Sequence, residues 1–360
     1  MIGRQRMKIH GLFVSAVLIC AMGVAVIGIL PSPAEAQTSL RIATSKEGTA
    51  GYTMGVGLAA SVKRNLKTVS MEALPTPGST ASVKILAKRG ADLTMASTWT
   101  LKDAYNNTGA FKKTPITRRP LQGWYYTTAN WVLITKADRK DINSLNDLVG
   151  KKFFPFVAGS GIFDVYRYVF NKMGIWDKMK IRQVGPMEAS DALQMGTVDV
   201  LGAYTVQGGA STVSWVRNVD ARVGIKVLLP KAEEKKFIGD IDGITSGTIS
   251  NKWMSPKNQK NNPSELWSWT LHYGYHPAPD VSTDVMYNIY KLWIEKADSE
   301  LKDISSTLKF YALGKPLEYQ VNGIAEAKGV PVHPGVAKYL KEKGLWKDEW
   351  VIGQLDPGVK

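Results

Sequence analysis

Alternation between short apolar runs and helical patterns is the feature of this sequence that constrains its fold most. Near its start the chain is expected to form strands at residues 40–44, 69–74 and 92–96, with helices at 52–64 and 80–88. The first helical stretch places Met54, Leu58 and Val62 on one face. This strand–helix–strand–helix–strand order predicts a parallel sheet covered by helices.

The same pattern recurs further along, so the sequence predicts a second α/β unit. Its expected strands lie at residues 131–135, 152–157, 181–184, 198–203 and 223–229, and its helices at 144–149, 162–173 and 187–194. The last third changes character and predicts amphipathic helices at 284–297, 301–311 and 336–343. No close repeat relates the two units, but 360 residues are enough for two or three domains.

The N-terminus has the parts of an export signal. Basic residues at positions 4, 6 and 8 precede an uncharged run at 11–30, and Ala34-Glu35-Ala36 forms a small-residue cleavage site. We therefore expect a signal peptide at residues 1–36, cleaved before Gln37, and a periplasmic location. The alternative is an uncleaved membrane anchor, because about twenty apolar residues can span a bilayer.

Charge and cysteine content exclude several classes of protein. The single cysteine, Cys20, lies inside the expected signal peptide, so a disulfide scaffold and a cysteine-based zinc site are excluded. The net charge is +15, and the part after residue 36 keeps 43 basic and 30 acidic residues. This excess favours anionic partners through its long-range field. The basic residues form no compact block, so no nucleic-acid partner is expected.

Loops that follow the expected strands carry the candidate binding chemistry. Three of them, at residues 45–51, 77–80 and 159–161, combine glycine with hydroxyl side chains and precede an expected helix. Backbone N–H groups and the dipole at a helix N-terminus favour an anion, and such loops meet at the carboxyl edge of a sheet. Ser97-Thr98-Trp99 forms a fourth candidate. For each loop alone, ordinary turn and N-capping chemistry remains the alternative.

The sequence contains no recognisable catalytic or cofactor motif. It has neither a Walker motif nor a dinucleotide G-x-G-x-x-G in a strand–helix context. His272 and His276 have the spacing of a helical metal clamp, but Gly274 and Pro277 disfavour a helix there and no third ligand is evident. We therefore expect no catalytic residue, no metal, no cofactor and no enzymatic activity.

The order of several short motifs resembles the TAXI family of solute-binding proteins, which serve TRAP (tripartite ATP-independent periplasmic) transporters. The resemblance covers about residues 38–345. Its motifs are Leu40-Arg41-Ile42-Ala43-Thr44 with Gly55-Val56-Gly57-Leu58-Ala59, Pro77-Gly78-Ser79 with Lys88-Arg89-Gly90-Ala91-Asp92-Leu93, residues 103–111, residues 144–152 with Ala158-Gly159-Ser160-Gly161, and His333-Pro334-Gly335 with Tyr339 and Lys343-Gly344-Leu345.

The resemblance implies a two-lobed α/β periplasmic-binding-protein fold, with mostly parallel sheets flanked by helices and a ligand cleft between the lobes. It places the first lobe at residues 37–132 plus 228–360 and the second at 133–227. It implies a receptor that captures a small organic anion or an amino acid such as glutamate and delivers it to the membrane subunits of a TRAP transporter. We expect a monomer. A secreted α/β hydrolase or transferase, and a ligand-sensing module of a membrane signalling system, are the alternatives.

Departures from the family pattern cluster where the ligand would be held. Thr49 stands for the second of two glycines, and Tyr52 is the only tyrosine left of two. Trp99 ends a segment that often reads Ser-Asp in the family, Ile162 replaces a threonine, and Tyr204 stands where an Ala-Gly pair is usual. A pocket with Trp99 and Ile162 would suit a bulkier and more apolar ligand than glutamate.

The expected ligand-binding residues are Ser45, Gly48, Thr49, Tyr52, Gly78, Ser79, Ser97, Thr98, Trp99, Ser160, Gly161, Ile162 and Tyr204. Ser79, Ser97 and Ser160 would donate hydrogen bonds, while Tyr52 and Trp99 would form walls. Two more tryptophans, Trp124 and Trp131, could line the cleft, with core packing as the alternative.

Overall fold

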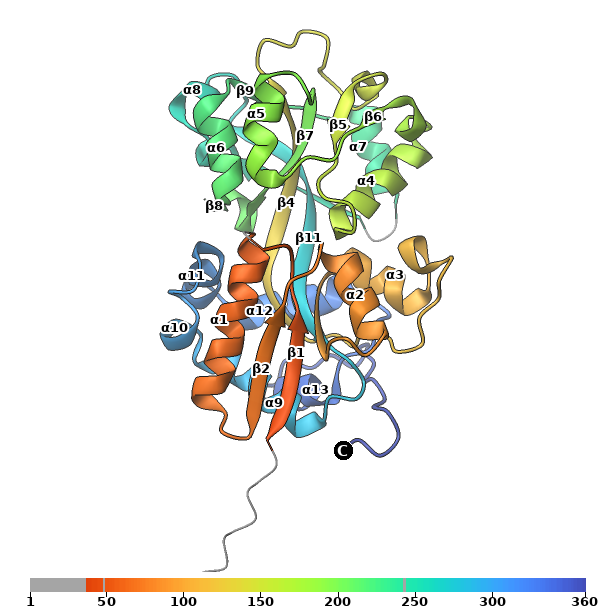
Figure 1. Ribbon diagram of the computed structural model, residues 1–360, viewed down its shortest axis with the longest axis vertical. Coiled ribbons are helices and arrows are strands. Elements are labelled where there is room, and N and C mark those ends of the chain that lie inside the picture. Colours follow the sequence, from red (N-terminus) through yellow and green to blue (C-terminus); the bar gives the residue numbers. More distant parts are fainter. Residues whose placement is uncertain (1–36, 48, 242–243) are drawn as a thin grey trace, which may run out of the picture. The chain divides into compact units, whose positions relative to one another are not determined.

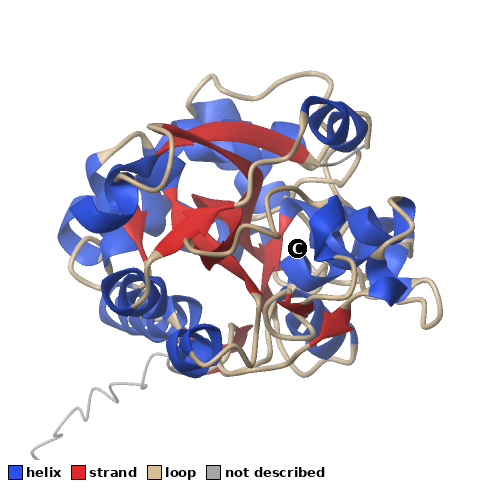
Figure 2. Ribbon diagram, turned by 90° about the horizontal axis from the view of Figure 1, so that it is seen from above, coloured by secondary structure: helices blue, strands red, loops and turns tan. Residues whose placement is uncertain are grey.

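The structure is a computed structural model that describes residues 37–47, 49–241 and 244–360. The expected signal peptide or anchor at residues 1–36 lies outside the described residues, as does Gly48 of the first candidate loop. Residues 37–360 form one compact unit, in which strands at the centre are surrounded by helices (Figure 2).

The predicted strands occur in the predicted order, with ends shifted by a few positions. The strands are β1 (Thr38–Ala43), β2 (Val69–Leu74), β3 (Leu93–Ser97), β4 (Trp124–Lys136), β5 (Lys152–Phe154), β6 (Lys180–Ile181), β7 (Val200–Val206), β8 (Ser211–Thr212), β9 (Ile225–Val227), β10 (Thr245–Ser250) and β11 (Glu265–Pro277). Strands β8, β10 and β11 were not predicted, and the helix predicted at 144–149 is only a short 3-10 helix. The predicted strand at 152–157 ends at Phe154, because Pro155 has no N–H to donate to a neighbouring strand.

The α-helices are α1 (Ala50–Asn65), α2 (Ser79–Ala87), α3 (Thr98–Asn106), α4 (Gly161–Lys172), α5 (Ala189–Gln194), α6 (Ser214–Arg222), α7 (Ala232–Gly239), α8 (Pro256–Gln259), α9 (Thr283–Glu295), α10 (Ala297–Glu300), α11 (Ser306–Leu313), α12 (Pro316–Glu326) and α13 (Pro334–Glu342). Short 3-10 helices are η1 (Gly109–Phe111), η2 (Asn146–Leu148), η3 (Trp176–Lys178), η4 (Pro186–Glu188), η5 (Gln207–Gly209) and η6 (Asn251–Trp253).

The strands form one mixed sheet. Their order is β2-β1-β3-β11-β4-β7-β5-β6, with β8, β9 and β10 paired to β7, β4 and β11. The pairs near the two ends, β1–β2, β1–β3, β5–β6 and β5–β7, are parallel. The central pairs β3–β11, β11–β4 and β4–β7 are antiparallel. The prediction of mostly parallel sheets therefore fits the two ends and not the middle, because β4 and β11, of 13 residues each, pair with strands of both ends.

β4 and β11 run between two lobes, one above the other in Figure 1. We call the part built on β2, β1 and β3 the first lobe, and the part built on β7, β5 and β6 the second lobe. Helices α1, α2 and α3 flank the first lobe together with α9 to α13, and α4 to α8 flank the second (Figure 1).

The segment after β9 packs on the second lobe, although the resemblance places residues 228–360 in the first. The side-chain oxygen of Asn258 accepts a hydrogen bond from the Ile225 N–H at 2.9 Å, and that of Asn262 accepts one from Val227 at 2.7 Å. Leu266 shares a hydrophobic cluster with residues of β7 and β9. The chain therefore returns to the first lobe along β11 and not directly after β9.

Local sequence explains why the helices beside the cleft begin where they do. The Ser97 and Ser160 hydroxyls accept hydrogen bonds from the N–H groups of Thr100 and Phe163, at 3.3 and 3.4 Å, so each caps a helix. Helix α1 packs on β2, and its buried Leu58 lies in the largest hydrophobic cluster.

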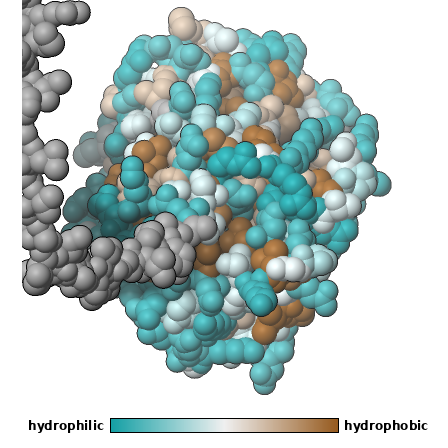
Figure 3. Space-filling view, turned by 60° about the horizontal axis from the view of Figure 1, so that its bottom comes forward, coloured by the Kyte–Doolittle hydropathy of each residue, from teal (hydrophilic) through white to brown (hydrophobic). Residues whose placement is uncertain are grey.

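The first-lobe side turned forward in Figure 3 is mostly hydrophilic, with apolar residues in separate patches.

Candidate functional site

A pocket lies between the two lobes, and residues of both line it. The space between the lining atoms, open solvent at the mouth included, is about 730 Å³, of which about 80 Å³ admits the centre of a water molecule. Such dimensions suit a small organic ligand. The lining has two chemically different parts, a polar end made of helix starts and a wall made of aromatic rings.

The polar end consists of helix N-termini. Thr49, Gly78, Ser160 and Val213 are the N-cap residues of α1, α2, α4 and α6, and all four line the pocket. The first N–H groups of a helix have no partner within the helix, and the dipole is positive at this end. Four helix starts at one pocket therefore favour a negatively charged ligand group.

The loops before α2 and α4 touch each other across the cleft. The N–H groups of Thr80 and Ala81 donate to the Gly159 carbonyl at 3.1 and 3.3 Å, and the Thr80 hydroxyl donates to Asp164 at 2.6 Å. Gly78 has φ +144°, and a Cβ on it would lie 3.0 Å from the Ser160 Cα. The two lobes are therefore in direct backbone contact at this edge of the pocket.

Two polar atoms of the pocket lining have no hydrogen-bond partner among the described residues, the Ser79 Oγ and the Trp131 Nε1, and Ser79 is the one that lies at a helix start. It is 1% exposed, it lines the pocket, and its Oγ has no hydrogen-bond partner among the described residues. By contrast, the Ser160 Oγ donates to the Val157 carbonyl at 2.6 Å, and Thr49 Oγ1 donates to the Lys46 carbonyl at 2.6 Å. A buried hydroxyl without a partner costs free energy, so a ligand that accepts a hydrogen bond from Ser79 would recover it.

The aromatic wall comes mainly from the second lobe and the crossing strands. Trp131 on β4 lies 4.5 Å from Tyr204 on β7 and 5.2 Å from Phe156, measured between ring centroids. Phe156 has φ +78°, which is unusual for a residue with a bulky side chain. Such strain often marks positions where a side chain is held for function. All three rings line the pocket.

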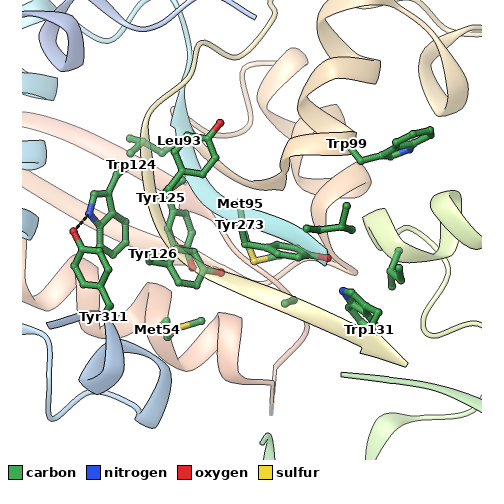
Figure 4. Packing of buried hydrophobic residues seen from close by; sticks show 14 of the residues in the cluster. Met54, Leu93, Met95, Trp99, Trp124, Tyr125, Tyr126, Trp131, Tyr273 and Tyr311 are labelled. Atoms are coloured by element: carbon green, nitrogen blue, oxygen red, sulfur yellow. Dashed lines mark hydrogen bonds between the residues drawn. The ribbon is translucent and has the colours of Figure 1, made fainter. Parts of the chain in front are cut away.

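Tyr126 reaches the pocket because of a bulge between the crossing strands. Tyr273 of β11 pairs with Thr127 of β4, but the next residue, Gly274, pairs with Tyr125, so Tyr126 is an extra residue in β4. Bulges bend a strand and redirect its side chains. Figure 4 shows Tyr126, Tyr273 and Met95 close together, and all three line the pocket.

The pocket carries little charge. Among its described lining residues, Lys46 is the only one with a charged side chain, and none is a histidine or a carboxylate. Burial raises the pKa of the Tyr204 phenol to about 12, and burial raises the pKa of Tyr126 and Tyr273 as well. All three phenols are therefore neutral at physiological pH. Such a lining can bind and orient an anion.

Seven of the expected ligand-binding residues line this pocket. They are Ser45, Thr49, Gly78, Ser79, Ser160, Gly161 and Tyr204. Six of them belong to the three glycine-containing loops, which the structure brings together although they are far apart in the sequence. Their role in binding stays a prediction. Gly48 lies outside the described residues.

The fourth candidate segment, Ser97-Thr98-Trp99, lies elsewhere. The Ser97 hydroxyl caps α3 and would be 2.8 Å from a Cβ on Gly161, so it faces that backbone. The Thr98 hydroxyl donates to Glu326. Trp99 packs on Tyr168 at 5.3 Å between centroids and lines a separate cavity; Figure 4 shows it apart from Tyr126, Tyr273 and Met95.

The other expected residues outside the pocket are buried or turned away. Ile162 is fully buried in the core, because it follows the N-cap in a helix whose apolar face packs inward. Tyr52 is half-buried in the first turn of α1 and does not line the pocket. Trp124 is also fully buried, and its Nε1 donates to the Tyr311 hydroxyl at 2.7 Å (Figure 4).

Sequence reasoning missed most of the aromatic wall. Trp131 is expected only as a residue that could line the cleft, and the sequence patterns give no expectation of a binding role for Tyr126, Phe156 or Tyr273. Strand periodicity shows only that such residues face the interior, and nothing local separates a pocket wall from a core. The available signal was the abundance of aromatic residues in β4 and β11, the two strands that cross the cleft.

The two histidines considered for a metal have different partners. His272 Nδ1 pairs with Glu326, whereas His276 Nδ1 accepts a hydrogen bond from the Gly123 N–H at 3.1 Å. Both lie on the strand β11, which the sequence pattern did not predict. In the part of the chain that the structure describes, no group of three potential metal ligands comes together, and no helix is long and apolar enough to cross a membrane.

Several solved structures resemble this chain at low sequence identity. A putative L-cystine ABC transporter from Listeria monocytogenes is 14% identical over 77% of this chain and 97% of its own, with a TM-score of 0.47. The aliphatic sulphonate binding protein SsuA from Escherichia coli is 14% identical over 88% and 96%, with a TM-score of 0.39. A putative sulfonate-binding SsuA from Methylobacillus flagellatus is 16% identical over 90% and 99%, with a TM-score of 0.45. Likenesses at this level leave the ligand of this chain open.

A family model gives the firmer assignment. The model of the NMT1-like family matches residues 42–344. This match spans both lobes, both crossing strands and all of the described pocket residues. The chain therefore belongs to the NMT1-like family.

Proposed function

We propose that this protein is an extracytoplasmic solute receptor that captures a small organic anion between its lobes and delivers it to a membrane transporter. One observation carries the proposal: four helices begin at an interlobe pocket whose described residues include a buried hydroxyl without a partner and no carboxylate. Such a site can hold an anion by hydroxyl and backbone donors at the helix starts.

Capture and release would use β4 and β11 as hinges. We propose a first lobe and a second lobe that close on the ligand by hinge motion. Based on the packing of α8 and β10, the second lobe would extend from residue 133 to about residue 268, past the boundary at 227 that the resemblance implies. The bulge at Tyr126 lies in the crossing strands, where a change of angle would alter both the cleft and a pocket wall.

The finer parts of the proposal concern location and partners. The order of the TAXI-type motifs supports a TRAP transporter as the partner, and the basic, apolar and small-residue pattern of residues 1–36 supports export to the periplasm with cleavage before Gln37. We also propose a monomer. Mass spectrometry of the exported protein should give the mass of a chain that begins at Gln37. The mass of a chain that keeps residues 1–36 would instead support an anchor.

The test of receptor function is ligand-dependent stabilisation. The purified protein, dialysed to remove bound ligand, is heated with a library of organic anions and amino acids. A ligand that binds the folded state raises the melting temperature in proportion to the logarithm of its concentration. At least one organic anion should do so, and a library without any such compound would contradict the proposal.

The type of transporter is tested separately with membrane vesicles that contain the candidate membrane subunits. Addition of the receptor and its ligand should allow uptake driven by an ion gradient without ATP. Uptake that requires ATP and ignores the gradient would contradict the TRAP assignment while leaving the receptor function intact.

A further inference from the structure

We propose that the ligand is a small monocarboxylate with a branched aliphatic or single-ring aromatic body, bound without help from an amino group or a second carboxylate. This inference rests on the proposed receptor function and narrows its ligand class. Its carboxylate would lie at the start of α2, beside Ser79, and its body would lie against Trp131, Phe156 and Tyr204.

The place of the carboxylate follows from the hydrogen bonds already made at the helix starts. The hydroxyls of Thr49 and Ser160 donate to the carbonyls of Lys46 and Val157. Ser79, which is 1% exposed, has an Oγ without a partner among the described residues. It is also the first residue of the nine-residue helix α2. A carboxylate at this point would accept from the Ser79 hydroxyl and lie in the positive field of the helix start.

The rest of the lining explains why the ligand should carry only one negative charge. Lys46 is the single charged side chain among the described residues of the pocket. A second carboxylate would have to leave water and lie against Trp131, Phe156 or Tyr204, whose side chains offer at most a phenol or an indole N–H. Burying an ion without a matching partner is unfavourable. Dicarboxylates such as succinate and glutamate should therefore bind weakly.

An ammonium group on the ligand also lacks a partner. No aspartate or glutamate occurs among the described residues that line the pocket, and the helix starts and Lys46 would repel a cation. The faces of Trp131, Phe156 and Tyr204 could attract a cation, but this attraction must overcome that field. An amino acid should therefore bind less tightly than the acid that lacks its amino group.

The size of the pocket limits the body of the ligand. About 80 Å³ admits the centres of water molecules, and one water needs roughly 10–15 Å³ of such space. The space therefore holds a ligand of roughly five to eight non-hydrogen atoms, on the same reasoning. A branched five-carbon chain on a carboxylate has this size, an aromatic ring on a carboxylate lies slightly above it, and both can make contact with the rings.

The test uses ligands of equal shape and different charge in isothermal titration calorimetry of the purified protein. The probes are 4-methylpentanoate, phenylacetate, succinate, leucine, aspartate and 3-methylbutylamine. Succinate matches 4-methylpentanoate in shape with a second carboxylate in place of the isopropyl group, and aspartate matches leucine in the same way. We expect 4-methylpentanoate or phenylacetate to bind at least tenfold more tightly than the other four probes.

Two variants locate the carboxylate. Ser79→Ala should weaken 4-methylpentanoate binding by about tenfold or more, because a hydrogen bond to a charged group is lost. Ser61→Ala is the matched control, since the Ser61 Oγ is also buried and has no partner in the described part of the chain, but does not line the pocket. It should leave the affinity unchanged. Equal effects of both variants would overturn the placement at α2.

The outcomes separate this inference from the receptor proposal. Tighter binding of succinate, leucine, aspartate or 3-methylbutylamine than of the two monocarboxylates would overturn the inference and leave a receptor of another ligand class. Failure of all six probes would also overturn it, and the wider receptor proposal would then depend on the anion library. Failure of that library as well would remove both.

Discussion

The two parts of the pocket lining differ in how they are built. The polar end consists of loops that connect a strand to a helix, so its donors are held by backbone and caps. The aromatic wall consists of side chains in strands and in the strained segment at Phe156, so it is held by packing. We infer that the polar end sets the charge of the ligand and the wall sets its body.

The largest effect on binding is expected at the aromatic wall. Trp131→Ala should weaken ligand binding at least 100-fold and lower the free energy of unfolding by about 3–5 kcal/mol, because it leaves a large cavity. Calorimetry and denaturant titration measure the two effects. Trp99→Ala is the control, since Trp99 is also buried at the lobe boundary but lines a different cavity. Trp99→Ala should lower the free energy of unfolding and leave the ligand affinity unchanged. A loss of affinity in this variant would instead place the ligand in the cavity beside Trp99.

The next effect concerns the contact between the two lobes. Gly78→Ala adds a Cβ 3.0 Å from the Ser160 Cα at a φ of +144°, so the lobes should fail to close fully. We expect binding about 10- to 100-fold weaker, on the scale of one to three kcal/mol for local backbone strain. Small-angle scattering should show a smaller ligand-induced compaction than in the unchanged protein.

Gly150→Ala controls for strain alone. Gly150 has φ +76°, but a Cβ there meets nothing within 4 Å. The variant should lose a similar amount of stability and bind normally. If both glycine variants bind normally, the contact between Gly78 and Ser160 does not matter for closure.

Within the polar end, two serines should behave differently. Ser79→Ala removes a hydroxyl that has no partner among the described residues, so the ligand-free protein should lose no stability and gain up to about 1–3 kcal/mol while binding weakens. Ser160→Ala removes a helix cap and should cost about 1 kcal/mol of stability. Chemical denaturation without ligand distinguishes them, and a clear stability loss in Ser79→Ala would show that this hydroxyl already has a structural partner.

The smallest effect on affinity is expected from pH. No described lining residue is a histidine or a carboxylate, so affinity for a carboxylate should stay constant between about pH 6 and pH 8. Asp164, next to the cleft, is the group most able to make the affinity depend on pH. Burial raises its pKa, while the hydrogen bond from the Thr80 hydroxyl acts against that rise. If affinity does change with pH and the change disappears in Asp164→Asn, its cause is Asp164 at its contact with Thr80.

The scaffold should respond to acid where the pocket does not. Burial lowers the pKa of His333 to about 4 from its ordinary value near 6.5. Its contribution to stability is therefore complete above pH 6.5 and is lost as pH falls towards 4. At pH 5 the loss is about 2 kcal/mol. His333→Gln should remove the His333 part of this dependence in denaturation curves and leave affinity unchanged, while the part due to His276, whose pKa burial lowers to about 3, should remain.

The contrast between the two parts also explains what could be read from the sequence. Ser79 and Ser160 could be predicted because the order strand, loop, helix can be recognised from local sequence, and it places such loops at one edge of a sheet. Trp131 and Tyr273 were not, because their pattern in a strand shows burial without showing which buried side chains face a pocket. Phe156 depends on a positive φ, and Tyr126 on a bulge, and neither has a sequence signal.

The fold divides in the same way. The parallel parts around β1 and β5 follow from alternating strand and helix patterns. The antiparallel centre does not, because β11 reads as an aromatic-rich segment interrupted by Gly274 and ended by Pro277. Trp99 was expected at the ligand because it follows a strand, but the helix α3 begins at Thr98 and carries its ring towards Tyr168.

The most direct test of the central claim is a crystal structure of the protein with the tightest-binding organic anion from the library. The account predicts density in the pocket between the lobes, with an anionic oxygen within hydrogen-bond distance of the Ser79 Oγ and the body against Trp131 and Phe156. A ligand bound in the cavity beside Trp99, or one whose charged group lies against the aromatic wall away from α2, would contradict it.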